Sequence, residues 1–218
     1  MKVKFCGISS RAEAETAVLL GADYVGFLVG ITHLAEDKLT NRAAREIIEQ
    51  VDFGRSIPIA VTHLTDASSV IAMMRELGVR AVQLHDNIGF DEIRKIRDTL
   101  AGLYIIKAVH VEGEMSIDSA LAAEEHADAL VLDSRTADRI GGTGLTHDWS
   151  VSRRIVEAVR KPVFLAGGLN PDNLRAAIDA VHPFGVDVNS GVEFPSGEKD
   201  PEKMKRFIQI ARTERSPA

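Results

Sequence analysis

The sequence predicts a single (β/α)₈ barrel, because eight short apolar runs alternate with eight segments of helical periodicity. The runs are almost continuously apolar, which is typical of parallel strands covered on both faces. With 218 residues and 45% hydrophobic content, the chain can bury one large core but is short for two domains. The same alternation permits an open doubly wound sheet, and the count of eight favours the closed barrel. We expect residues 1–213 to form the barrel and 214–218 a frayed tail.

The strands are expected where β-branched and apolar residues cluster between turn residues. Several of the runs end on a polar residue, and the C-terminal strand ends form the active site of such barrels. In order, the runs cover residues 3–6, 22–29, 57–63, 81–85, 103–110, 127–133, 162–167 and 184–189.

The segments between the strands carry the apolar spacing of amphipathic helices. Two of them open with a capping residue followed by proline, at Asn170–Pro171 and Asp200–Pro201, which predicts helix starts at these positions. The helical segments cover residues 11–21, 41–51, 67–78, 90–100, 116–126, 147–159, 170–181 and 200–211.

Composition makes several classes of protein improbable. The net charge is −6, and no dense run of Lys or Arg follows a nucleic-acid backbone, so nucleic acid is not an expected partner. The first residues lack the apolar stretch of a secretion signal, and no apolar run approaches the roughly 18 residues that span a bilayer. We therefore expect a soluble, cytoplasmic protein without a membrane partner.

Two glycine-containing turns predict a phosphate site. Gly167 and Gly168 follow the seventh strand, while Ser190 and Gly191 follow the eighth. Glycine lets the backbone approach a ligand closely, and exposed N–H groups attract anions. The loops after strands seven and eight are the recurrent phosphate site of this fold, although each pair of residues taken alone also suits a simple tight turn.

Cys6 and Asp133 are the candidate catalytic residues. Cys6 ends the first strand, and its thiolate would accept a proton if a nearby positive group lowered its pKa. Asp133 ends the sixth strand, where burial would hold its carboxyl protonated as a general acid. The simpler alternatives are an inert buried thiol and a carboxyl that caps the next turn. Together, a base and an acid above a phosphate site favour isomerisation of a sugar phosphate.

The chain resembles the phosphoribosylanthranilate isomerases of tryptophan biosynthesis. The resemblance spans nearly the whole chain, and its most specific parts are the GGTG-x-x-x-DW and AGGLNP-x-N patterns. The motifs that carry it are KFCGI (4–8), GADYVGF (21–27), AVQLH (81–85), VLDSRT (131–136), GGTGLTHDWS (141–150), LAGGLNPDNL (165–174) and GVDVNSGVE (185–193).

The resemblance implies a cofactor-independent Amadori rearrangement that converts an aldose derivative into a ketose. Cys6 matches the general base that removes the proton from C2 of the sugar, and Asp133 matches the general acid that opens the furanose ring. Gly142 and Gly144 match a loop that closes near the substrate. Gly168, Ser190 and Gly191 match the phosphate-binding turns, and His85 and Asp187 match polar positions at the mouth of the barrel.

The departures from the family lie on the substrate side. Asp37 stands where the family carries an arginine for the anthranilate carboxylate, so we expect Lys38 beside it to take that role. Thr62 and His63 replace apolar residues after the third strand, and we expect His63 to contact substrate. Asp86 and His147 also differ from the family pattern. A paralogue that isomerises, epimerises or cleaves another phosphorylated sugar therefore remains an alternative.

Two further hypotheses stay open. Five of the seven histidines, His33, His63, His85, His110 and His147, fall at or just beyond strand ends, and histidine is a common metal ligand. No tight ligand motif supports a metal, so we expect none. A non-catalytic barrel that binds a phosphorylated metabolite would fit the lost arginine but not the retained Cys6 and Asp133. The pattern leaves a monomer or a homodimer equally open.

Overall fold

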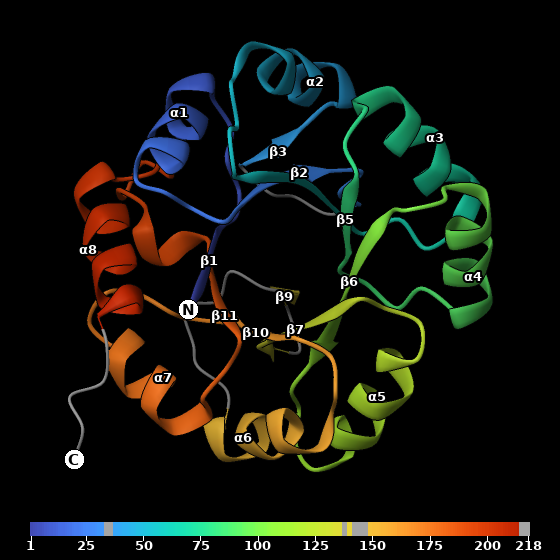
Figure 1. Ribbon diagram of the computed structural model, residues 1–218, viewed down its shortest axis with the longest axis vertical. Coiled ribbons are helices and arrows are strands. Elements are labelled where there is room, and N and C mark those ends of the chain that lie inside the picture. The colour runs from blue at the N-terminus through green and yellow to red at the C-terminus, as the bar shows by residue number, and fades with distance from the viewer. Residues whose placement is uncertain (33–36, 137–138, 141–147, 214–218) are drawn as a thin grey trace.

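The chain forms a closed barrel of parallel strands surrounded by helices (Figure 1). The computed structural model describes residues 1–32, 37–136, 139–140 and 148–213. The barrel strands are β1 (Lys2–Phe5), β2 (Tyr24–Val29), β4 (Ile57–Thr62), β5 (Ala81–Leu84), β6 (Tyr104–His110), β7 (Ala129–Asp133), β10 (Val163–Leu165) and β11 (Gly185–Val188).

Strand β1 closes the barrel, because it pairs in parallel with both β2 and β11. Every pairing in the main sheet is parallel, and the order of its barrel strands is β1-β11-β10-β7-β6-β5-β4-β2. This closure confirms the barrel and removes the open sheet as an alternative.

The helices lie in an outer ring around the strands (Figure 1). They are α1 (Arg11–Leu19), α2 (Asn41–Gln50), α3 (Ala67–Leu77), α4 (Phe90–Thr99), α5 (Met115–Glu124), α6 (Trp149–Ala158), α7 (Leu174–Val181) and α8 (Pro201–Arg212). Each falls within or beside a helical segment expected from the sequence. No helix among the described residues is long and apolar enough to cross a membrane.

Helix α8 begins as its sequence predicts, whereas α7 does not. Asp200 caps α8 by accepting hydrogen bonds from the backbone N–H groups of Glu202 and Lys203, with Pro201 in the first turn. Helix α7 begins only at Leu174, with Asn173 as its N-cap. The Asn170 side chain instead caps a separate turn ahead of the helix, so the predicted start at Asn170–Pro171 is wrong by about one turn.

Four short elements lie in the segments that connect barrel strands to the helices after them. Strand β3 (Lys38–Leu39) pairs with β2, and β8 (Arg135–Thr136) forms a two-residue antiparallel pair with β9 (Arg139–Ile140). A 3₁₀ turn, η1 (Ser190–Val192), follows β11. The sequence predicts none of them, because two- or three-residue elements leave no periodicity to detect.

The core has two layers, which decides what faces the barrel interior. Val3 and Phe5 of β1 pack in the larger core between strands and helices, while Cys6 belongs to a smaller cluster inside the barrel. Side chains alternate along a strand, so Lys4 lies on the same side as Cys6. The interior therefore receives a lysine and a thiol from one strand.

Candidate active site

Four of the predicted site residues, Cys6, His85, Asp133 and Asp187, lie buried at the C-terminal ends of barrel strands. In parallel strands these ends meet at one mouth of the barrel. The residues come from distant parts of the chain, and strand register brings them together: Lys4 pairs with Asp187, and His110 with Asp133.

Asp133 is held in an environment that favours its neutral form. Its Oδ1 accepts a hydrogen bond from the backbone N–H of Ser134 at 2.8 Å, and its Oδ2 lies 3.4 Å from His85 Nε2. Burial, together with the charge of Asp187, raises the pKa of Asp133 to about 7. A substantial fraction of this carboxyl therefore carries a proton at neutral pH, as a general acid requires.

His85 is buried in its neutral form beside Asp133. Burial and the nearby His63 and His110 lower the pKa of His85 well below its usual value. Gln83 Nε2 lies 3.0 Å from His85 Nδ1. When this amide donates to Nδ1, the imidazole proton is on Nε2, which faces the Asp133 carboxylate. His85 thus supplies a neutral donor to the acid.

Cys6 is buried next to an ion pair. Lys4 Nζ donates to Asp187 Oδ2 at 2.6 Å, and both side chains are almost completely buried. Burial raises the pKa of Cys6 to about 11, while the charge of Lys4 opposes this rise. Asp187 Oδ1 has no hydrogen-bond partner among the described residues. The arrangement leaves one carboxylate oxygen as an acceptor for a ligand.

The two predicted phosphate turns lie against each other. Gly167 and Gly168 both have left-handed backbone conformations, with φ of 82° and 66°. A Cβ added to Gly191 would lie 1.8 Å from the carbonyl oxygen of Leu169, so the turn at η1 packs directly on the turn after β10. Only glycine allows this approach at residue 191. The result is a paired, partly exposed turn beside Asp133.

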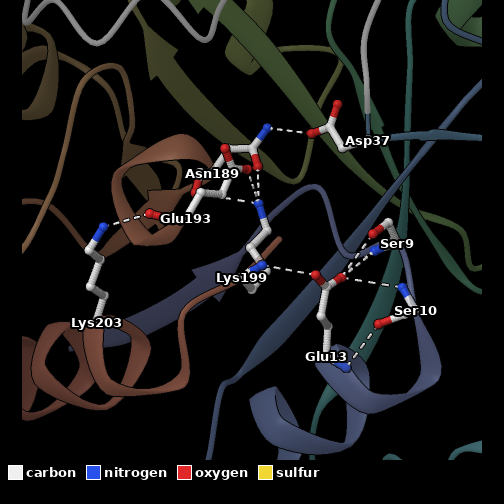
Figure 2. Close-up of polar contacts among 8 residues, drawn as sticks. All are labelled: Ser9, Ser10, Glu13, Asp37, Asn189, Glu193, Lys199 and Lys203. Carbon is white, nitrogen blue, oxygen red and sulfur yellow. Dashed lines mark hydrogen bonds and ion pairs between the residues drawn. The ribbon is translucent and has the colours of Figure 1, made fainter. Parts of the chain in front are cut away.

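A polar network joins Asp37 to the end of β11 (Figure 2). Asn189 Nδ2 donates to Asp37 Oδ2 at 2.7 Å, while Asn189 Oδ1 accepts from Lys199 Nζ. The ammonium of Lys199, which is buried, also contacts Glu193 Oε1 at 2.5 Å. Because Asn189 has a cation on its oxygen and a carboxylate on its nitrogen, its orientation is fixed.

The network continues to the first helix (Figure 2). The backbone N–H of Lys199 donates to Glu13 Oε1 at 2.9 Å. The other oxygen of Glu13 accepts from the backbone N–H groups of Ser9 and Ser10 as part of the capping box of α1. The residues Ser9, Ser10, Glu13, Asp37, Asn189, Glu193 and Lys199, which we call the mouth network, thus connect the segments after β1, β2 and β11.

The remaining predicted residues are an exposed lysine, a histidine beside His85, and residues outside the described chain. Lys38 is exposed on β3, and its side chain makes no hydrogen bond or ion pair with the described residues. His63 is buried with its ring centre 5.0 Å from that of His85. Gly142 and Gly144, like His33 and His147, fall outside the described residues. Within the described part of the chain, no three His, Cys, Asp or Glu side chains are arranged to hold a metal ion.

Sequence reasoning missed Lys4, Gln83 and Lys199. A lysine in a strand is normally read as exposed, and the partner of Lys4 depends on the register of β1 and β11. Lys199 meets Asn189 and Glu193 only because the chain folds back after η1. Gln83 lies two positions before a predicted site residue, His85, and therefore on the same side of the strand. This alternation is the one signal that would have found it.

Comparison with known proteins shows which family the sequence matches. The family described as N-(5'phosphoribosyl)anthranilate (PRA) isomerase matches residues 3–210. The chain is 39% identical to N-(5'-phosphoribosyl)anthranilate isomerase 2 of Methanosarcina mazei over 216 residues, which covers 98% of this chain and 95% of that protein. The isomerase of Methanocella arvoryzae is 37% identical, over 97% of this chain and 98% of that protein.

Solved structures of the same family are also similar to this chain. Phosphoribosyl anthranilate isomerase from Thermotoga maritima superposes with a TM-score of 0.85 and 34% identity, covering 97% of this chain and 98% of that one. A phosphoribosyl anthranilate isomerase solved in complex with reduced 1-(o-carboxyphenylamino)-1-deoxyribulose 5-phosphate gives a TM-score of 0.82 and 32% identity over 97% and 98%. The chain therefore belongs to the N-(5'-phosphoribosyl)anthranilate isomerase family.

Proposed function

We propose that this chain isomerises N-(5'-phosphoribosyl)anthranilate to the ring-opened carboxyphenylamino-deoxyribulose phosphate. The observation that carries the proposal is that a buried thiol, Cys6, and a buried carboxyl beside His85, Asp133, lie at the same mouth of the barrel. Membership of the isomerase family over residues 3–210 supports the reaction.

Asp133 is proposed as the acid that opens the sugar ring. Its proton passes to the furanose oxygen, the bond from that oxygen to C1 breaks, and the nitrogen lone pair forms a Schiff base. The carboxylate left behind faces His85 Nε2 at 3.4 Å. A neutral imidazole that donates to this carboxylate lowers the cost of the buried charge.

Cys6 is proposed as the base that acts on the Schiff base. Its thiolate takes the proton from C2, so a C–H bond breaks, an S–H bond forms, and the electron pair moves into the enolamine. In the ketonisation the Cys6 thiol returns its proton to C1, and the C2 hydroxyl gives its proton to the Asp133 carboxylate. Each proton removed is matched by one returned, so both groups are restored and no redox cofactor is needed.

The remaining site residues are proposed to bind the substrate. We propose that the phosphate group binds at the paired turn of Gly167, Gly168, Ser190 and Gly191, because backbone N–H groups in such turns attract anions. Asp187 Oδ1 offers its unused acceptor to a sugar hydroxyl. The roles of Gly142 and Gly144 rest on the family resemblance alone.

Recognition of the aromatic carboxylate must differ from the family pattern. Asp37 occupies the position of the family arginine, and its carboxylate is directed to Asn189. A carboxylate there repels an anionic ligand. We propose Lys38 and His63 as substrate contacts, because Lys38 carries the adjacent positive charge and His63 lies in the histidine group that includes His85.

The proposal is tested by identifying the product. Phosphoribosylanthranilate is generated in situ with the purified protein, the mixture is reduced with borohydride, and the reduced ketose phosphate is sought by mass spectrometry. We expect the reduced carboxyphenylamino-deoxyribulose phosphate at a rate far above the protein-free control. Its absence with folded protein would refute the anthranilate substrate.

The Asp37–Asn189 contact favours one second candidate, a paralogue for a different phosphorylated sugar. A ligand without an aromatic carboxylate would not need the missing arginine. Incubation with a panel of aldose phosphates, followed by detection of the corresponding ketoses, separates the two candidates. Turnover of such a sugar but not of phosphoribosylanthranilate would favour the paralogue.

A further inference from the structure

A buried lysine flanks the candidate base. Lys4 is 1% exposed and lies two residues before Cys6 on β1, on the same side of the strand. A Cβ added to Gly26 would lie 3.1 Å from Cys6 Sγ and 3.3 Å from Lys4 Cε, so both side chains border the same point beside β2. The absent side chain of Gly26 makes the room for both.

The ammonium of Lys4 is oriented by one carboxylate. Its Nζ donates to Asp187 Oδ2 at 2.6 Å, and the strand register places these two residues opposite each other. Burial alone would lower the pKa of Lys4, but Asp187 and Cys6 together raise it. Lys4 is therefore a cation inside the barrel, shared between a carboxylate and a sulfur.

Four charged groups from different segments act on Cys6. Lys4 and Lys199 favour its thiolate, while Asp187 on β11 and Asp37 after β2 oppose it. The ammonium of Lys199 is held by other partners, because it contacts Asn189 and Glu193. Lys4 has the larger effect of the two cations and lies on β1, two residues before Cys6.

We propose that Lys4 is a positioning residue for the general base: held by Asp187, its ammonium stabilises the Cys6 thiolate that accepts the substrate proton. When the S–H bond forms, the sulfur becomes neutral and the ammonium remains paired with Asp187. The catalytic part of this inference rests on the proposed function, but the electrostatic part does not. Without Lys4, the buried Cys6 thiolate would have no buried cation beside it on the same strand to offset its desolvation.

The thiol can be titrated without any substrate. Cys6 is the only cysteine, so the rate of alkylation by iodoacetamide, followed by intact-protein mass spectrometry from pH 6 to 10, reports on this sulfur alone. Asp187→Asn removes the competing carboxylate, and Lys4→Met/Asp187→Asn removes both charges. Comparing these two variants tests the ammonium with Cys6 as its remaining charged partner, and avoids an unpaired buried carboxylate.

We expect Lys4→Met/Asp187→Asn to be alkylated about tenfold more slowly than Asp187→Asn at pH 8, since one pKa unit is tenfold in thiolate population. Superimposable rate-against-pH curves would overturn the proposal. Should the double variant not fold, Lys4→Gln/Asp187→Asn keeps a neutral hydrogen-bonded pair in the same place and gives the same comparison.

Turnover separates this inference from the proposed function. The pH profile of kcat should move to higher pH in the double variant relative to Asp187→Asn, a change that a purely structural role for Lys4 would not produce. If wild-type protein fails to turn over phosphoribosylanthranilate while the alkylation difference persists, the proposed function fails and the electrostatic role stands. Normal turnover with no alkylation difference refutes the role of Lys4.

Discussion

At the scale of single residues, burial raises the pKa of both candidate catalytic residues, Asp133 and Cys6. The pKa of Asp133 rises to about 7 and that of Cys6 to about 11, so both neutral forms are favoured. This suits the acid at neutral pH. It works against the base, which must exist as a thiolate when the substrate proton is transferred.

The pH dependence of kcat/KM follows from these two values. The active form needs Asp133 protonated and Cys6 ionised. Below about pH 7 we expect log kcat/KM to rise with a slope near one, because the thiolate fraction grows about tenfold per pH unit. Above it the gain in thiolate is offset by loss of the acid, giving a plateau. Rates from pH 5 to 9 test this, and a steady rise through pH 9 would contradict it.

Asp133→Asn should lose activity and gain stability. We expect kcat to fall by about 10²–10⁴, the usual contribution of a general acid. In the folded state the pKa of Asp133 is above its ordinary value, so its stabilising effect is lost as pH rises through about 7. Asparagine does not ionise. The variant should therefore be more stable than wild type at pH 8, by on the order of a few kcal/mol, and show no such gain at pH 4.

Urea unfolding at the two pH values measures this difference. The comparison is made between variant and wild type at each pH, so that other titrating groups contribute equally to both. Equal stability of the two proteins at pH 8 would show that ionisation of the buried Asp133 does not lower the free energy of unfolding.

The sequence predicts Cys6 and Asp133 because each ends an apolar run, but it does not predict their surroundings. Lys4 looks like an exposed residue until β11 places Asp187 opposite it. Asp37 looks like a lost ligand contact, whereas the structure directs it to Asn189. Both interactions depend on residues more than 150 positions apart.

At the scale of elements, the mouth network ties three strand-end segments together (Figure 2). Lys199→Met would leave Glu193 and the Asn189 oxygen without their buried cation. We expect a loss of about 3–5 kcal/mol in the free energy of unfolding and a raised KM, because Asn189 precedes the phosphate turn. Urea unfolding and initial rates test both.

Lys203→Met is the matched control for this change. Lys203 lies on the first turn of α8 and donates to the backbone oxygen of Glu193 at 2.6 Å, but it is only half-buried. It should lose no more than about 1 kcal/mol. Equal losses in the two lysine variants would contradict the central place of Lys199.

Gly191→Ala tests the paired phosphate turn. The added methyl group would meet the Leu169 carbonyl oxygen at 1.8 Å, so the two turns must separate, at a cost of about 1–3 kcal/mol. We expect inorganic phosphate to raise the melting temperature of wild type and to have much less effect on the variant. Differential scanning fluorimetry measures both.

Gly89→Ala provides the control for this steric effect. Gly89 has an ordinary backbone conformation, and an added Cβ meets nothing within 4 Å. This variant should keep the stabilisation by phosphate. A full phosphate response in Gly191→Ala would show that the paired turn is not the phosphate site.

The main elements were predictable from the sequence because their length gives periodicity a chance to appear. The exceptions have local causes. Asn170 caps a turn that the Asn–Pro pair suggests is a helix, and β3, β8 and β9 have only two residues each. Such short strands depend on tertiary pairing, which no local pattern encodes.

At the scale of the whole molecule, closure of the barrel decides which residues meet. Strand β1 contacts both β2 and β11, and its two neighbours deliver Gly26 and Asp187 to the sides of Lys4 and Cys6. The sequence supports the count of strands and the closed form. It leaves open the register, and therefore the ion pair and the position of the acid relative to His85.

The most direct test of the central claim follows the loss of phosphoribosylanthranilate over time by its fluorescence. The substrate is generated in situ, and the assay is run with wild-type protein and with Cys6→Ser. We predict rapid decay with wild type and a rate at least about 10²-fold lower with the variant, while the two proteins unfold at similar urea concentrations. Equal decay with both proteins would refute Cys6 as the base. No decay above background with folded wild type would contradict the assignment of this barrel as a phosphoribosylanthranilate isomerase.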